Sequence, residues 1–88
     1  MIKALIAEDD RITRRMLEVI LGEWGYETVA VRDGLAAWDA LRHADGPWIA
    51  LLDWLMPGID GLELCRRIRA LPTRQPPYVI LLTVRNSR

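Results

Sequence analysis

The sequence predicts an α/β fold with a doubly wound parallel sheet. Short apolar runs alternate with amphipathic, helix-like segments along the whole chain. Such alternation with short connections is typical of a parallel sheet that helices cover on both faces. The chain has 88 residues, which is enough for one small domain, so we expect a single domain over residues 1–88.

The apolar runs predict the strands. We expect them at residues 2–7, 26–31, 48–53 and 78–84. The first, third and fourth runs are almost entirely apolar, which is typical of strands buried on both faces. The second run alternates and is partly β-branched, which also favours a strand. Pro57 and Gly58 follow the third run, so a loop must begin soon after Asp53.

The segments between the strands predict three helices, at residues 11–24, 34–43 and 61–70. Gly25 is a suitable stop for the first helix. Asp33 is a suitable N-cap for the second, and Asp60 with Glu63 forms a capping-box pattern before the third. We expect the core-facing residues to be Ile12, Met16, Val19 and Ile20 in the first helix, Leu35, Trp38 and Leu41 in the second, and Leu64, Ile68 and Leu71 in the third.

Composition excludes several functions. Twelve basic and twelve acidic residues give a net charge of zero, which argues against nucleic-acid binding by this domain through bulk charge. The cluster Arg66, Arg67 and Arg69 is expected to form a solvated helix face. No window is long enough to span a membrane, and no signal peptide is evident, so we expect a cytoplasmic protein. A single cysteine, Cys65, excludes an internal disulfide.

Acidic residues follow two of the predicted strands. Glu8, Asp9 and Asp10 come after the first strand, and Asp53 ends the third. If those strands are neighbours, the carboxylates converge at one edge and repel one another, unless a hard divalent cation such as Mg2+ lies between them. Thr83 follows the fourth strand, where its hydroxyl could bond a phosphoryl oxygen. Helix capping by Asp9 or Asp10, and an ordinary strand role for Thr83, are the alternatives.

Taken together, these motifs resemble the receiver domain of two-component response regulators. The resemblance rests on Glu8-Asp9-Asp10, on the segment from Leu51 to Gly58, on Asp60-Gly61 and on Leu81-Leu82-Thr83. It implies a flavodoxin-like receiver fold and a phosphoryl group transferred to Asp53 from a sensor histidine kinase that binds transiently. It also implies Mg2+ ligands at Asp9 and Asp53, at Glu8 through water and at the backbone carbonyl of Leu55, with Thr83 as the switch hydroxyl. Asp10 is not expected to be a ligand.

The chain departs from the family pattern at its C-terminal end. Receiver domains continue with a further helix, strand and helix, and with a lysine that contacts the phosphoryl group. This sequence stops at Arg88, and its one lysine, Lys3, opens the first strand. We therefore expect a C-terminally truncated receiver, (β-α)3-β with strand order 2-1-3-4, in which phosphorylation is impaired. We also expect homo-oligomers that form through the exposed fourth strand.

Two other functions remain open. The first is a structural or dimerisation fragment that takes no phosphoryl group. The second is an enzyme, a Mg2+-dependent aspartyl phosphatase, because phosphatases of the haloacid dehalogenase type look similar in outline. Those enzymes usually carry a second aspartate two residues after the nucleophile, where this chain has Leu55. We therefore expect a domain that is not an enzyme.

Overall fold

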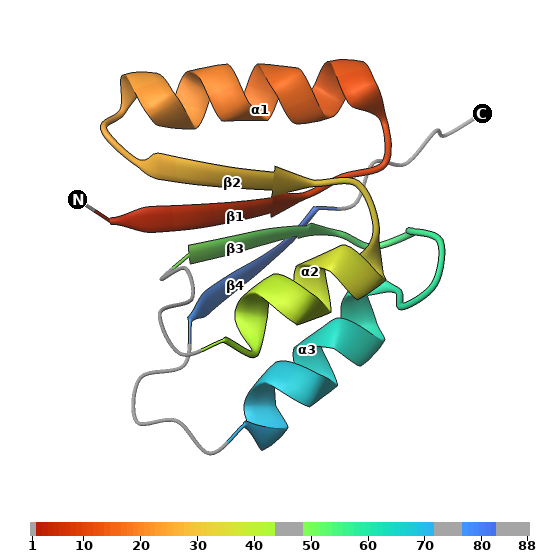
Figure 1. Cartoon of the computed structure of the whole chain (residues 1–88). Coiled ribbons are helices and arrows are strands. Elements are labelled where there is room, and N and C mark those ends of the chain that lie inside the picture. The colour runs from red at the N-terminus through yellow and green to blue at the C-terminus, as the bar shows by residue number, and fades with distance from the viewer. Residues whose placement is uncertain (1, 44–48, 72–76, 83–88) are drawn as a thin grey trace.

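Helices and strands alternate along the whole described chain (Figure 1). The computed structural model describes residues 2–43, 49–71 and 77–82. The elements are β1 Lys3–Ala7, α1 Arg11–Glu23, β2 Glu27–Val31, α2 Gly34–Leu41, β3 Ile49–Asp53, α3 Gly61–Ala70 and β4 Tyr78–Leu82. All seven predicted elements are therefore present. The ends of the third and fourth predicted strands, at Trp48, Thr83 and Val84, lie outside the described residues.

The strands form a parallel sheet in the order β2-β1-β3-β4, as expected. In the register of β1 and β3, Ala7 is the partner of Leu52. In the register of β3 and β4, Asp53 is the partner of Leu82. Because every strand runs in the same direction, the C-terminal ends of β1 and β3 lie side by side at one edge of the sheet.

Helices cover both faces of the sheet (Figure 1). On one face α1 contacts β1 and β2, and on the other α2 packs against α3 and β1. The larger core lies beneath α2 and α3, and its most completely buried large side chains are those of Leu5, Leu52, Leu64 and Ile68. The smaller core lies beneath α1 and contains Ala4, Ile6, Leu21 and Leu51. The two cores bury β1 and β3 on both faces of the sheet and hold the ends of these strands in place.

Each helix begins at an aspartate that caps its first turn. The side chains of Asp10, Asp33 and Asp60 accept hydrogen bonds from the backbone N–H three residues later, each at 2.8 Å. The caps at Asp33 and Asp60 agree with the sequence prediction, and of the two candidates for the first helix Asp10 is the cap. Across the described residues, every helix is too short or too polar to cross a lipid bilayer.

The predicted core face of α1 is wrong. Ile12, Met16 and Val19 are exposed by 77%, 52% and 42% of their surface, whereas Leu17 and Leu21 pack into the core. Both sets of side chains recur at helical spacing, so periodicity alone could not distinguish them. An apolar stripe of α1 therefore faces away from the sheet.

β4 is also less buried than its apolar sequence suggests. It lies at the edge of the described sheet, and Tyr78 and Ile80 are 80% and 49% exposed. Val79 and Leu81 pack against the core beneath α2 and α3, so one face of β4 is covered and the other is largely open.

The predicted core face of α2 is correct in part. Trp38 and Leu41 contact the core as predicted, whereas Leu35 is exposed.

Candidate functional site

The predicted acidic residues do meet at one edge of the sheet. Glu8 and Asp9 follow β1, and Asp53 is the last residue of β3, the neighbouring strand. One carboxylate oxygen from each of the three lies within 4.8 Å of the other two. Asp10 is not part of this acidic group. Its carboxylate points into the first turn of α1, where it accepts hydrogen bonds from the N–H and hydroxyl of Thr13.

Glu8 is a buried carboxyl with an unsatisfied oxygen. Its side chain is only 3% exposed, and its Oε2 accepts a hydrogen bond from the N–H of Asp10 at 3.0 Å. Its Oε1 is buried with no hydrogen-bond partner among the described residues. Burial raises the pKa of Glu8, and the carboxylates of Asp53 and Asp9 raise it further, although the N–H of Asp10 acts in the opposite direction. A cation beside these carboxylates, or a water bound to it, would satisfy this oxygen and reduce the repulsion among the three carboxylates.

Asp53 is buried beside that group. It is 8% exposed, and its Oδ1 accepts a long hydrogen bond, 3.4 Å, from the N–H of Leu55. Three carboxylates in one small volume form an all-oxygen donor set, which is what Mg2+ and Ca2+ prefer. The residues present thus fit a hard divalent cation. The carbonyl of Leu55 stays a predicted ligand, and Thr83 lies outside the described residues.

A glycine allows α3 to begin against the end of β3. A Cβ atom on Gly61 would lie 2.7 Å from the carbonyl oxygen of Asp53 and 3.1 Å from the Cα of Trp54. Instead, the N–H of Gly61 donates to the carbonyl of Trp54 at 3.0 Å. The sequence pattern marked Asp60-Gly61 only as a helix start, so the second role of Gly61, which is to keep the backbone of Asp53 in place, was not predicted.

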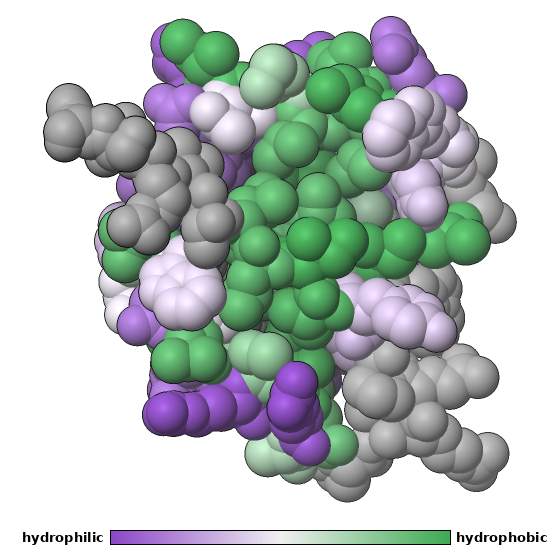
Figure 2. Space-filling view, turned by 180° about the vertical axis from the view of Figure 1, so that it is seen from behind, coloured by the Kyte–Doolittle hydropathy of each residue, from purple (hydrophilic) through white to green (hydrophobic). Residues whose placement is uncertain are grey.

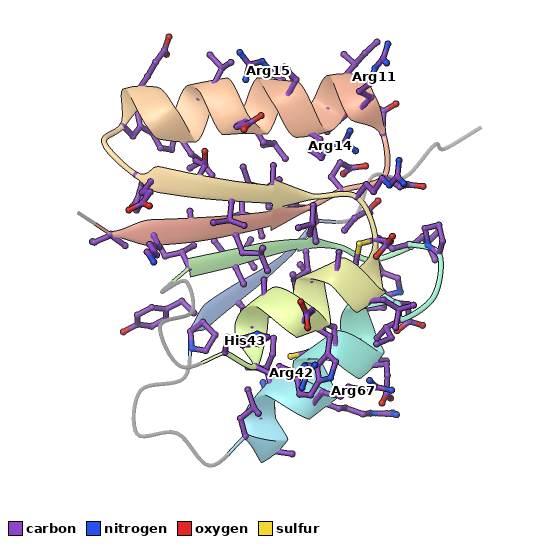
Figure 3. All side chains as sticks on the ribbon, in the orientation of Figure 1. Arg11, Arg14, Arg15, Arg42, His43 and Arg67 are labelled. Carbon is purple, nitrogen blue, oxygen red and sulfur yellow. The ribbon has the colours of Figure 1, made fainter. Side chains whose placement is uncertain are left out.

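Arg14 anchors the loop that carries the acidic residues, and sequence reasoning also missed it. Its Nη1 donates to the backbone carbonyl of Glu8 at 2.9 Å, and the N–H of Glu8 donates to Val31 at 3.1 Å. In Figure 3 the side chain of Arg14 points from α1 toward the strand ends, whereas Arg11 and Arg15 point away from the sheet.

Replacing Arg14 with methionine should therefore loosen the loop between β1 and α1. We expect Mg2+ affinity to fall about threefold to tenfold and unfolding free energy to fall by about 1 kcal/mol, the usual value of one hydrogen bond. Urea unfolding and calorimetric titration with Mg2+ would measure the two effects. Arg11→Met, which removes an exposed arginine from the same helix, is the matched control and should change neither quantity appreciably. Equal effects from both variants would contradict the anchoring role.

Comparison with known proteins identifies the class to which this fold and this acidic edge belong. The family model of the response regulator receiver domain matches residues 4–88. The chain belongs to that family. Solved structures agree: the signal receiver domain of a signal transduction histidine kinase from Syntrophus aciditrophicus is 39% identical with a TM-score of 0.85, over 99% of this chain and 65% of that one. The N-terminal domain of a response regulator receiver protein from Methanoculleus marisnigri is 30% identical with a TM-score of 0.82, over 98% and 69% of the two chains.

Similar full-length proteins are regulators. The transcriptional regulatory protein TctD of Salmonella typhimurium is 42% identical over 85 residues, which make up 97% of this chain and 37% of TctD. The transcriptional regulatory protein CseB of Streptomyces coelicolor is 46% identical over 65 residues, or 74% of this chain and 27% of CseB. The chain thus spans about a third of the length of these relatives.

Proposed function

We propose that this chain is the phosphoacceptor module of a two-component phosphorelay, in which Asp53 receives a phosphoryl group from a sensor histidine kinase. The observation that carries the proposal is the position of Asp53 at the end of β3, with its carboxylate close to those of Glu8 and Asp9. An aspartate used only to end a strand would not need two further acidic residues just after the neighbouring strand.

The proposed transfer is a direct displacement at phosphorus. An oxygen of the Asp53 carboxylate attacks the phosphorus of a phosphohistidine, the P–N bond breaks, and the imidazole leaves as the product forms an acyl phosphate. Burial of Asp53 limits its hydration, and the N–H of Leu55 makes a long hydrogen bond to one of its oxygens. The exposed side chains of Trp54 and Leu55 border the carboxylate and would contact the kinase.

We propose that Mg2+ is the cofactor, held by Asp9 and Asp53 directly, by Glu8 through water and by the carbonyl of Leu55. When bound, the ion neutralises the negative charges that would otherwise keep a carboxylate and a phosphoryl group apart. Calcium prefers more ligands in a looser geometry, whereas Mg2+ suits few carboxylates completed by waters and a phosphate oxygen. Thr83 remains the proposed switch hydroxyl.

Phosphorylation of these 88 residues should be weak. The lysine of the sequence, Lys3, is the first residue of β1, at the opposite end of that strand from Glu8 and Asp9. No lysine of this chain therefore stands beside Asp53 to contact the phosphoryl group. We infer that the modified state forms with low yield or is short-lived.

The test is to incubate the chain with acetyl phosphate and Mg2+ and to follow its intact mass. We expect a labile added phosphoryl group at low occupancy that disappears completely in Asp53→Asn. The matched control is Asp60→Asn, because asparagine also caps helices and this aspartate is outside the acidic group. An added group that persists in Asp53→Asn would place the acceptor elsewhere, and no modification at all would favour the alternative of an unphosphorylated structural fragment.

Steady turnover of phosphomonoesters would instead favour the phosphatase alternative, which Leu55 at the second position after Asp53 argues against. Relatives such as TctD and CseB are called transcriptional regulators. We therefore propose a cytoplasmic role in which this domain controls an output and does not itself bind nucleic acid. Pairing between copies at the open edge of β4 stays a prediction.

A further inference from the structure

The outer face of α1 is an apolar stripe with helical spacing. Ile12, Met16 and Val19 lie four and then three residues apart, and each is more than 40% exposed. Their side chains are opposite Leu17 and Leu21, which fill the core beneath the helix. A seam with this spacing is the pattern by which one helix packs along another.

The charges that flank the stripe are divided along the helix. Arg11 and Arg15 lie in the N-terminal half, whereas Glu18 lies in the C-terminal half, and Glu23 continues the line of the stripe four residues after Val19. Arg15 and Glu18 form an ion pair at 3.3 Å, and the side chain of Arg15 remains 72% exposed. Figure 3 shows Arg11 and Arg15 on the side of α1 that points away from the sheet, where another molecule could contact them.

We propose that a second copy of this chain packs on this stripe, with the two α1 helices antiparallel about a two-fold axis between Met16 and Val19. In that arrangement Met16 of each copy meets Val19 of the other. Arg15 of each copy then comes beside Glu18 of the other, so each exposed ion pair joins a network of four charges across the axis.

The charge pattern favours a second copy over other occupants. The basic half of the flank is complementary to the acidic half of the same helix, and an antiparallel two-fold places those halves opposite each other. A parallel pairing would place arginines against arginines. The interface does not depend on Asp53, so this inference is independent of the proposed phosphorylation.

The apolar surface continues beyond the helix. Figure 2, which views the molecule from behind, shows hydrophobic side chains gathered in the middle of the face turned away from α2 and α3. The partly buried Ile20 lies beside the stripe on α1, and Ile80 is 49% exposed on the same face of the sheet as the core beneath α1. One helix pair alone buries less than a standard interface of about 800 Å² per partner, so we expect a weak dimer with a Kd of about micromolar order.

The first test is sedimentation equilibrium of the 88-residue chain across that concentration range. Val19→Glu should weaken the dimer about tenfold or more, because a carboxylate would be buried in the seam. Leu62→Glu is the matched control: it introduces the same group at a similarly exposed position on α3, on the opposite face of the sheet from α1 (Figure 1), and should leave the dimer intact. Ile80→Glu separates this interface from the other predicted contact, which is pairing through β4. Circular dichroism would establish that all three variants fold. Loss of the dimer in Ile80→Glu alone would assign the contact to β4 and overturn the proposal. A chain that is monomeric at every concentration would also overturn it, and would indicate that another protein covers the stripe.

The second test uses the charges. Arg15→Glu alone and Glu18→Arg alone each place like charges across the axis, so each variant should dimerise about threefold to tenfold more weakly. A mixture of the two variants should form a heterodimer, because the glutamates of one copy then face the arginines of the other. No preference for the heterodimer in the mixture would overturn the antiparallel arrangement.

Discussion

Replacing Gly34 with alanine should lower the free energy of unfolding by about 3 kcal/mol or more, at the upper end of what overpacking costs. Gly34 is the first residue of α2 and packs directly against the loop before α3. A Cβ atom there would lie 1.8 Å from the carbonyl oxygen of Ile59 and 2.7 Å from its carbonyl carbon. Backbone atoms cannot rotate aside as a flexible side chain can, so either α2 or the loop must shift. Urea unfolding followed by circular dichroism would measure the loss.

The matched control is the same substitution at Gly22. This glycine lies inside α1, is exposed, and has no atom within 4 Å of the position that a Cβ would take. Alanine is favoured over glycine in a helix, and Gly22 lies in the last turn of α1, so Gly22→Ala should raise the free energy of unfolding by about 0.5 kcal/mol, the lower end of the value for a helix interior. The two variants should therefore have opposite signs, and a stabilised Gly34→Ala would contradict the close contact between α2 and the loop.

The fold and the acidic edge could be predicted because both follow from order along the chain. Alternating apolar runs and helical segments imply parallel strands, and parallel strands bring their C-terminal ends together. The carboxylates of Glu8, Asp9 and Asp53 come together if β1 and β3 are neighbours, and the strand order makes them neighbours. The aspartate caps are local signals of the same kind, since each involves residues three apart.

The face that α1 turns to the sheet could not be predicted in this way. Its sequence contains two apolar stripes with the same period, and the rotation of the helix decides which of them is buried. That rotation agrees with contacts beyond the helix, namely Arg14 reaching the carbonyl of Glu8 and Leu21 packing into the sheet. Gly34 and Gly61 are similar cases. Each is required where two segments approach closely, and nothing in the local sequence reveals that approach.

Replacing Glu8 with glutamine should raise the stability of the cation-free domain and lower its affinity for a divalent cation. The pKa of Glu8 is raised in the folded chain above its ordinary value of 4.5, chiefly by burial. The folded state therefore binds this proton more tightly than the unfolded state does, and the fold loses stability as the pH rises from about 4.5 through the raised pKa. Glutamine has no charge to bury. Without divalent cations, we expect Glu8→Gln to be about 1 kcal/mol more stable than the original chain at neutral pH. This value is the lower end of the cost of an unsatisfied buried group. Below about pH 4.5 the two chains should be equally stable, because Glu8 is then protonated in both the folded and the unfolded state.

With Mg2+ present, the original chain should become more stable than Glu8→Gln. A ligand that binds only the folded state stabilises it according to its affinity, so the original chain should gain thermal stability as Mg2+ is added. Glu8→Gln removes one of the three carboxylates, and its apparent affinity for Mg2+ should fall about tenfold or more, as for other changes in the ligand shell. Asp10→Asn makes the same change in charge next to the acidic group, but Asp10 caps α1 and lies outside that group. Its response to Mg2+ should stay close to that of the original chain. If Asp10→Asn and Glu8→Gln lose the response equally, the effect comes from net charge at this edge, and Glu8 has no specific role in holding the ion.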